Sequence, residues 1–390
     1  MSVVTQNGTS APVAHTVSAG MPAPFHPLPS WSHCIPTLDR IDILERAVRL
    51  SLAQSHPPTE IIIVDSGNNY ALNRARIEAV LAASPQPAPD LQYVQGRMRS
   101  STVQREQAAA IASGEVLFFF DDDTLMFPDC AAALLSVYAA DRQNRIAAAG
   151  ASHVPALPDA GAGDIARKDS ARNQDRARSA LAQTLGRWIW SEVFMMNAAR
   201  HFIFYDRPRR HGSAADVAAL GIDGLYHLPL IAGYAMTVRR EVARLEPFDT
   251  TLLSYAPAED LDASYRFSRH GLTVGVTGAH VHHFEAASGR IRRRQAITLG
   301  LMNVASFVAR GSVNRPADIV AYYIMFLRRL LAEFCKDLLS RRFTFPQFLG
   351  ACSALPRSIA VFRFQGDDFA GWYGDKQRDV LGQPSSTKGA

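Results

Sequence analysis

Cysteine is scarce in this sequence. The four cysteines, Cys34, Cys130, Cys335 and Cys352, lie far apart and include no Cys-x-x-Cys pair. Zinc-binding modules and disulfide-stapled scaffolds need closely grouped cysteines, so the spacing argues against both classes. It is compatible with a reducing compartment, and we expect the protein in the cytoplasm.

Charge is missing from the start of the chain, because no Lys, Arg, Asp or Glu precedes Asp39. This Pro, Ser, Thr, Ala and Gly-rich start lacks the basic beginning and compact apolar segment of a signal peptide. We predict a disordered leader over residues 1–30. Long apolar runs are missing as well, since the uncharged stretch 295–309 is shorter than the ~20 residues that a membrane-spanning helix needs. We therefore expect no integral membrane segment.

The positive charge is concentrated in one segment. The formal net charge is +5, yet residues 286–345 contain eleven Lys or Arg against three Asp or Glu. Such local basicity indicates an anionic partner surface, lipid or phosphate, and we expect no nucleic acid. The composition, 47% apolar and 20% charged, is that of a globular protein and excludes disorder of the whole chain.

Strands and helices are predicted to alternate from residue 31. Short apolar runs predict strands at SHCI, EIIIVD, LQYVQ and EVLFFF, and helical spacing predicts helices at about 40–54, 70–83 and 102–113. This order predicts an α/β protein with a mostly parallel, doubly wound sheet flanked by helices. Such sheets bind ligands at the carboxyl ends of their strands. Asp65 and Asp121 both follow a strand at that edge.

The run FFFDDD sets three apolar residues against three neighbouring carboxylates, Asp121, Asp122 and Asp123. If the extended conformation continues past Phe120, Asp121 and Asp123 point to one side and Asp122 to the other. Two carboxylates on one side suit a divalent cation. The alternative is a solvated turn before a helix, with Pro128 in its first turn. The second acidic strand end favours a site.

These residues carry a family resemblance. PTLDR, the strand ending at Asp65 and SGEVLFFFDDD together resemble the nucleotide-sugar half of family 2 glycosyltransferases, which have the GT-A fold. The resemblance implies that Pro36, Thr37, Arg40 and Asp65 hold the nucleoside. It also implies that the Asp-x-Asp motif binds a divalent metal, Mg or Mn, through Asp123, and ribose or metal through Asp121. Asp122 is placed on the donor side, with the least certain role.

The helix VQREQAAAIASGE is similar to the family's Ala-Arg-Asn-x-Gly helix, but it has Glu106 and Ala108 where Asn and Gly are usual. Only Arg105 is therefore carried over as a donor-binding residue.

A second motif lies about 135 residues downstream. AEDLDASYRFSRHG predicts a helix whose first turn holds Glu259 and Asp260, where the helix dipole favours ionised carboxylates. Acids are common in first turns, so the pattern alone is only a helix start. The surrounding Gly-x-x-Met-x-x-Arg-Arg and Glu-Asp-x-Asp strings resemble the acceptor motif of the same family. The resemblance implies that Asp260 is the catalytic base and that Glu259 places it or touches the acceptor.

The string GAHVHHF adds a histidine to the expected metal site. The family pattern Ala-x-Val-x-His matches His283, which the resemblance places on the metal or near the diphosphate, with His282 as the alternative. The Gln-x-x-Arg-Trp motif of processive synthases is absent, which favours transfer of single sugars or short extension. A nucleotidylyltransferase is disfavoured because residues 36–40 contain no glycine.

Two further regions carry weaker predictions. Residues 318–342 predict a basic amphipathic helix, with Ile319, Phe326, Leu327 and Phe334 in its apolar stripe, that either lies on a membrane surface or packs on the catalytic domain. The aromatic-rich middle, residues 155–226, gives no site residue.

The resemblance completes the expected organisation. It predicts a GT-A catalytic domain over residues 31–300, with a nucleotide-sugar half (31–150) and an acceptor half (151–300). A basic helical extension (301–366) and a loose tail (367–390) follow.

The expected activity is metal-dependent, inverting transfer of a hexosyl or deoxyhexosyl group in polysaccharide biosynthesis. The donor is UDP-, dTDP- or GDP-linked, and the acceptor is a saccharide or lipid-linked saccharide. We expect a cytoplasmic protein, and peripheral attachment to the inner face of the membrane is one of the two alternatives for its basic helix. A glycoside hydrolase, which also uses paired carboxylates, and a non-catalytic nucleotide-sugar-binding protein are the alternatives.

Overall fold

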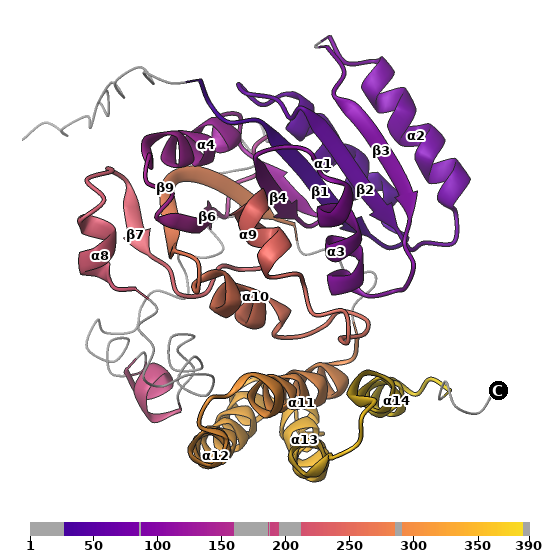
Figure 1. Ribbon diagram of the computed structural model, residues 1–390. Coiled ribbons are helices and arrows are strands. Elements are labelled where there is room, and N and C mark those ends of the chain that lie inside the picture. The colour runs from indigo at the N-terminus through magenta and orange to yellow at the C-terminus, as the bar shows by residue number, and fades with distance from the viewer. Residues whose placement is uncertain are drawn as a thin grey trace, which may run out of the picture.

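The computed structural model describes residues 27–85, 87–159, 186, 188–194, 212–284 and 291–384. Its described strands form one sheet in the order β3-β2-β1-β4-β8-β6-β9-β5, with β7 paired to β9 (Figure 1). The strands are β1 (Trp31–Thr37), β2 (Glu60–Asp65), β3 (Asp90–Gln95), β4 (Val116–Phe120), β5 (Thr124–Met126), β6 (Ile146–His153), β7 (Leu225–His227), β8 (Ala235–Arg239) and β9 (Leu272–His283).

The sheet is parallel in its first half and mixed in its second. Strands β1 to β4 pair only in parallel with one another, as the alternation of strands and helices predicts. Strand β8 then pairs antiparallel with both β4 and β6. The carboxyl ends of β1, β2 and β4 therefore meet at one edge, where Thr37, Asp65 and the aspartate triplet lie.

Helices cover both faces of this sheet. Alternate residues of β2 show the division, because Ile61 and Ile63 pack against α1 (Ile41–Leu52) and α2 (Tyr70–Ala82), while Ile62 packs in the core of the opposite face. That second face is covered by α3 (Ser101–Ile111), α9 (Arg240–Leu245) and α10 (Glu259–Phe267). Helix α4 (Cys130–Ala140) packs on Phe118 and Phe120. The α/β class with a flanked central sheet is confirmed.

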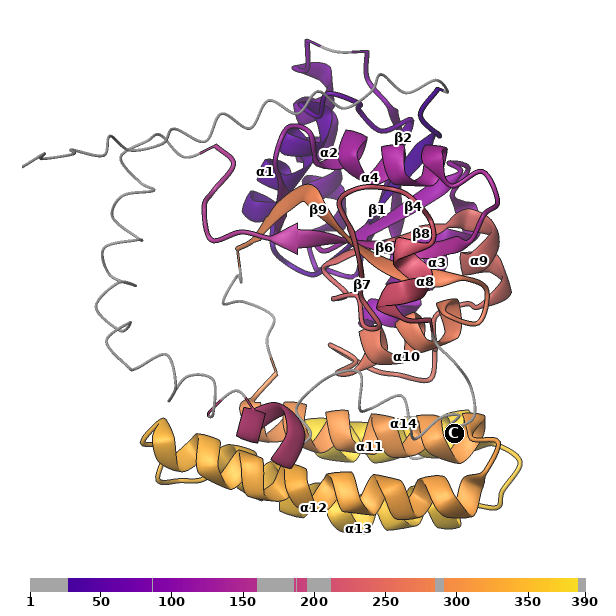
Figure 2. The ribbon, with the colours of Figure 1, turned by 90° about the vertical axis from the view of Figure 1, so that its left-hand side faces the viewer.

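The C-terminal region is helical, as predicted. Its helices are α11 (Arg293–Gly311), α12 (Arg315–Leu339), α13 (Pro346–Arg363) and α14 (Phe369–Leu381). Helices α11 and α14 lie nearer the sheet, and α12 and α13 form the layer farther from it (Figures 1 and 2). Buried residues of α11 to α14 share one core with Leu261 and Tyr265 of α10, so this unit packs directly against the α/β part of the protein.

Two expected boundaries are wrong. The helical unit begins at Arg293, within the stretch assigned to the catalytic domain. The tail expected to be loose from residue 367 contains α14, whose Tyr373 and Gln377 are fully buried. The leader expected over residues 1–30 lies almost wholly outside the described residues, which begin at Pro27.

The stripe expected on α12 is also only partly right. Phe326 is buried in the helical core, but Leu327, Phe334 and Leu338 are exposed. Ile319 of the expected stripe also packs against this core, together with Tyr323 and Leu330, beside the buried residues Ala321, Tyr322, Met325 and Phe326. Among the described helices, none is long and apolar enough to cross a bilayer.

The short middle elements that the structure describes are the π-helical turn η2 (Ile189–Val193) and helix α8 (Ala214–Ala218). The aromatic run at residues 202–206 lies outside the described residues.

Candidate active site

The aspartate triplet forms a turn between two strands. Strand β4 ends at Phe120, and the amide of Thr124 donates to the carbonyl of Asp121 at 2.9 Å. Residues 121–123 therefore form a turn and not the continued strand considered from the sequence, yet Asp121 and Asp123 still converge. Asp121 and Asp123 lie on one side, and Asp122 is directed to the other.

Three side chains converge on the first side. Ligand atoms of Asp121, Asp123 and His283 all lie within 4.8 Å of one another, and His283 Nε2 is 3.3 Å from Asp123 Oδ1. They meet because β5 pairs antiparallel with β9, which sets Thr124 opposite His283. Two carboxylates and an imidazole are a donor set that suits a divalent cation such as Mn.

The imidazole of His283 is held in place by its neighbours. Its ring stacks on Tyr234 with a centroid distance of 4.2 Å, and its backbone amide donates to His153 Nδ1 at 3.3 Å. Supporting contacts of this kind fix the orientation of a metal-binding ring. The alternative, His282, is directed elsewhere, with Nδ1 3.0 Å from the carbonyl of Val154.

Asp122 is fully buried on the second side of the turn. It accepts a 2.7 Å hydrogen bond from the hydroxyl of Thr37, and Arg40 Nη2 lies 2.5 Å from its other oxygen. Burial raises the pKa of Asp122 to about 7, and the Arg40 guanidinium opposes that rise. Arg40 also donates to Asp123 at 3.1 Å. Thr37 and Arg40, expected on the nucleoside, thus hold the aspartate turn.

Asp65 lies at the end of β2 and is fully buried. Its carboxylate accepts from the amide of Gly67 at 2.6 Å, from Asn73 Nδ2 at 3.0 Å and from the Tyr93 hydroxyl at 2.7 Å. A Cβ at Gly67 would lie 2.6 Å from Asp39 Oδ1, so only glycine fits between the two acids. The sequence reasoning missed Asp39, Asn73 and Tyr93, because these partners come from three different elements. Pro36 is buried within β1.

Arg105 joins the two acidic motifs. Its guanidinium donates to Asp121 at 2.6 Å and to Glu259, and it also donates to the carbonyl of Gly233 at 3.0 Å. A Cβ at Gly233 would lie 2.4 Å from the Glu259 carboxylate, which explains the glycine there. The side chain is buried, and both terminal nitrogens are occupied by protein atoms. The structure thus gives Arg105 protein partners at both terminal nitrogens, and its expected contact with the donor stays a prediction.

Helix α10 begins at Glu259 and presents Asp260 in its first turn. Asp260 is partly exposed and accepts from the amide of Leu261 at 2.9 Å. Burial raises the pKa of Asp260 and raises that of Glu259 to about 7, while Arg105 acts against both rises. Burial therefore outweighs the ionising effect expected from the helix dipole. A carboxyl with a raised pKa at a partly open position suits a general base.

Tyr255 is a further residue that the sequence did not single out. Tyr255 is 57% exposed and lies four residues before Glu259. An exposed aromatic next to a carboxylate is a common sugar-binding surface.

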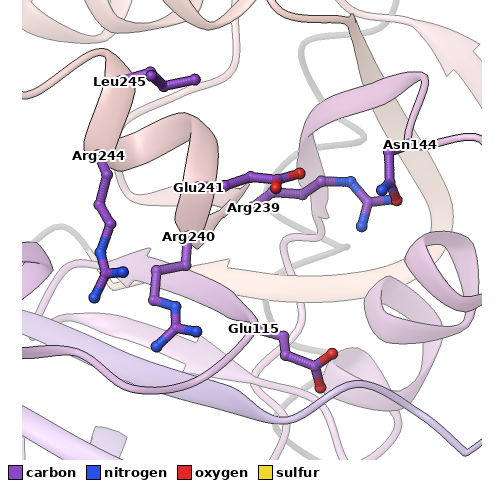
Figure 3. A pocket seen from close by; sticks show the side chains of 7 residues that line it. All are labelled: Glu115, Asn144, Arg239, Arg240, Glu241, Arg244 and Leu245. Carbon is purple, nitrogen blue, oxygen red and sulfur yellow. The ribbon is translucent and has the colours of Figure 1, made fainter.

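A separate cleft lies elsewhere in the described part of the chain. It has a volume of about 530 Å³ and is lined by Glu115, Asn144, Arg239, Arg240, Glu241, Arg244 and Leu245 (Figure 3). Glu115 precedes β4, so this cleft opens at the amino edge of the parallel strands, opposite the aspartate turn. Its Arg239 is already paired with Asp141 at 3.1 Å. The candidate site therefore rests on converging side chains and not on this cleft.

Comparison with protein families gives a direct result. The model described as "Glycosyl transferase family 2" matches residues 32–156, which carry Asp65, Arg105 and the aspartate turn. Residues 32–156 are therefore similar to glycosyl transferase family 2. The family that the motifs predict is thereby confirmed, and the match ends before Glu259 and His283.

Comparison with curated proteins finds no match. Among solved structures, the mannosyltransferase PcManGT from Pyrobaculum calidifontis, in complex with GDP-Man and Mn2+, is 14% identical with a TM-score of 0.48, covering 87% of this chain and 89% of its own. GalNAc-T7 with UDP, GalNAc and Mn2+ is 18% identical with a TM-score of 0.47, over 72% of this chain and 48% of its own. S. aureus TarS 1-349 is 11% identical with a TM-score of 0.47, over 90% and 87%.

Proposed function

We propose that this family 2 glycosyltransferase moves a sugar from a nucleotide-diphosphate sugar to a hydroxyl of an acceptor, with inversion at the anomeric carbon. The observation that carries the proposal is the pairing of two acidic groups across one buried guanidinium. Asp121 of the aspartate turn and Glu259 beside Asp260 both bind Arg105. A metal-binding acid and a candidate base are thus fixed relative to each other at the carboxyl edge of the sheet.

The donor side is supported by the residues that would hold a divalent cation, Mg or Mn. Asp121, Asp123 and His283 provide oxygen and nitrogen ligands, and Asp123 is buried at the site. When bound, such a cation neutralises charge on the diphosphate leaving group. Asp121 also lies where a ribose hydroxyl could bind. Asp122, paired with Thr37 and Arg40, keeps the turn in this conformation.

The nucleoside lies, in this proposal, against the ends of β1 and β2, near Pro36 and Asp65. The Asp65 carboxylate is ordered by Gly67, Asn73 and Tyr93, so it is positioned before any ligand arrives. Neighbouring Asp39 accepts from the amide of Asn68 at 2.8 Å and adds a second acid to this wall. UDP-, dTDP- and GDP-linked hexoses or deoxyhexoses remain the candidate donors.

The acceptor side is supported by Asp260 and Tyr255. Asp260 removes the proton of the attacking hydroxyl, which forms a bond to the anomeric carbon as the bond to the diphosphate breaks. A single displacement of this kind inverts the configuration. The exposed Tyr255 ring packs against the acceptor, a saccharide or lipid-linked saccharide, as polysaccharide biosynthesis requires.

We also assign the outer face of α12 and α13 to the surface of an anionic membrane, at its cytoplasmic side. Residues 291–363 contain twelve Lys or Arg and three acids, Asp318, Glu333 and Asp337. All three acids are fully buried, so the exposed charge of this segment is positive only. Exposed apolar side chains accompany it on α12, at Val320, Ile324, Leu327, Leu331, Phe334 and Leu338. Apolar side chains among cations are typical of helices that lie in a lipid interface.

The experiment is a panel of UDP, dTDP and GDP sugars, incubated with Mn or Mg or with a chelator, in which release of the nucleoside diphosphate is measured. Turnover that needs the metal is expected with one nucleotide class. Asp260→Asn is expected to abolish turnover while binding of the nucleoside diphosphate survives. A fully active Asp260→Asn variant contradicts the assignment of the base. Metal-independent release of free sugar from an oligosaccharide would instead support a hydrolase, and binding without turnover a non-catalytic protein.

A further inference from the structure

The loop before helix α10 has an unusual backbone. Ser254, Ala256 and Ala258 have φ angles of 60°, 44° and 70°, although none of them is glycine. Tyr255 and Pro257 lie between these three residues in sequence. The loop then leads directly into Glu259 and Asp260. Residues with side chains adopt such angles at a cost and keep them only where their surroundings impose them.

Some of the contacts that hold this loop come from the start of helix α3 and the two residues before it. The amide of Ser254 donates to the carbonyl of Arg99 at 3.1 Å, and the amide of Ser101 donates to the carbonyl of Ser254 at 3.0 Å. The hydroxyl of Ser100 donates to the carbonyl of Leu252 at 2.6 Å. These contacts hold the beginning of the loop. They do not reach Pro257 or Ala258, which immediately precede the helix.

Other contacts with the loop come from the C-terminal helices. Asn303 of α11 donates through Nδ2 to the carbonyl of Pro257 at 2.8 Å. Its Oδ1 accepts a 2.6 Å hydrogen bond from the hydroxyl of Tyr373 on α14. Both side chains are fully buried, so neither bond competes with water. The carbonyl next to the left-handed Ala258 is thus fixed by a chain of two buried hydrogen bonds.

Gln377, one turn further along α14, holds the loop at a second point. Its Nε2 donates to the carbonyl of Thr251 at 2.7 Å, and its Oε1 accepts from the amide of Leu253 at 2.9 Å. This fully buried amide therefore satisfies one donor and one acceptor of an irregular backbone. Asn303, Tyr373 and Gln377 are named the polar bridge.

We propose that the polar bridge consists of positioning residues that set the approach of Asp260 to the acceptor hydroxyl, so that helices α11 and α14 are part of the catalytic apparatus. The inference rests on the proposed function, because it takes Asp260 as the base. None of the three residues contacts substrate in this assignment. They act on the loop backbone, and the loop sets the first turn of α10.

The buried polar groups themselves argue for this role over simple packing. An apolar side chain would fill the same core without the cost of burying a polar group. The three members of the polar bridge use their polar atoms on the loop or on one another. Tyr322, in the same helical core, differs, because its hydroxyl bonds Leu301 and Ser358 within the helical unit. Tyr322 therefore provides a matched control.

The test compares Tyr373→Phe with Tyr322→Phe, each of which removes one buried hydroxyl from the same core. Turnover is measured with the nucleotide sugar and Mn, and hydrogen exchange is measured on peptides covering residues 249–262. Tyr373→Phe is expected to lower kcat about 10- to 100-fold with KM for the donor unchanged, since small displacements of a reacting group have effects of that size. It is also expected to speed exchange in residues 249–262. Tyr322→Phe should change neither quantity.

Gln377→Met is the second variant, because it keeps the shape of the side chain and acts at the other end of the loop. It is expected to reproduce the loss of kcat and the faster exchange. Equal effects of Tyr373→Phe and Tyr322→Phe on kcat and exchange would overturn the inference. A wild-type protein that turns over no nucleotide sugar would instead refute the proposed function. In that case unchanged exchange at residues 249–262 in both bridge variants would still refute the bridge.

Discussion

Arg105 on α3 and Glu259 at the start of α10 form a buried ion pair between residues that lie 154 positions apart in sequence. The same guanidinium binds Asp121 at 2.6 Å, so one side chain sets the distance between the donor and acceptor motifs. The pair also packs on Gly233, whose carbonyl accepts from Arg105. The catalytic geometry that we propose therefore depends on a residue that touches neither substrate.

A double-mutant cycle measures this pair. Arg105→Met leaves the Glu259 carboxylate buried without its partner, which typically costs about 3–5 kcal/mol of the free energy of unfolding. Because burial raises the pKa of Glu259, the variant is expected to lose more stability as the pH rises and the carboxyl ionises. Adding Glu259→Gln should restore part of the loss. Additive effects of the two substitutions in chemical unfolding would show that the pair is not coupled.

The metal site is tested by comparing two adjacent histidines. His283→Ala is expected to weaken Mn binding at least about 10-fold, the smaller of the losses seen when groups that orient metal ligands are removed. Asp123→Ala is expected to abolish it. His282→Ala is the control, since that ring bonds the carbonyl of Val154 and not the cluster. Titration calorimetry with Mn and a nucleoside diphosphate reads the affinity. Equal loss in both histidine variants would argue against His283 as a ligand.

The sequence predicts the donor half well, for a physical reason. The strand EIIIVD is buried on both faces, so its apolar run ends where the ligand edge begins and places Asp65 correctly. Asp121 contacts Arg105 and Asp122 contacts Thr37, a division that strand alternation also predicts but that a turn produces here. The roles of Asp260 and His283 are predicted from the family resemblance alone. Their neighbouring residues in the sequence do not indicate which distant segments they approach.

What the sequence does not predict depends on contacts between distant segments. Arg105 is carried over from the family's helix motif, which does not reveal its contact with Glu259 far along the chain. Helix α14 was not predicted, although Phe369, Trp372, Tyr373 and Val380 follow a helical spacing and pack on the helical core. The Arg105–Glu259 pair and the buried amide of Gln377 are polar contacts that form only when distant segments pack together.

The pH dependence of turnover follows from Asp260. A general base acts in its ionised form, and burial raises the pKa of this carboxyl above its usual value of about 3.9. As the pH falls through the raised pKa, kcat/KM is expected to decline tenfold per pH unit, and this acid limb should lie above the range of a free aspartate. Donor binding measured at each pH separates this effect from loss of the substrate. An acid limb at the position of an unperturbed carboxyl would contradict the burial of Asp260.

Membrane attachment is tested on the exposed side of α12. Leu327 and Leu331 are 61% and 59% exposed, and Leu331 lines a small cleft with Trp188 and Arg328. The double variant Leu327→Asp, Leu331→Asp places two anions on the proposed lipid face, so flotation with vesicles containing phosphatidylglycerol is expected to be lost. Leu245→Asp is the matched control, because Leu245 is 64% exposed on α9. Wild-type binding should weaken with added salt and be absent on vesicles of phosphatidylcholine alone. Equal flotation of all three proteins would exclude the exposed side of α12 as the attachment surface.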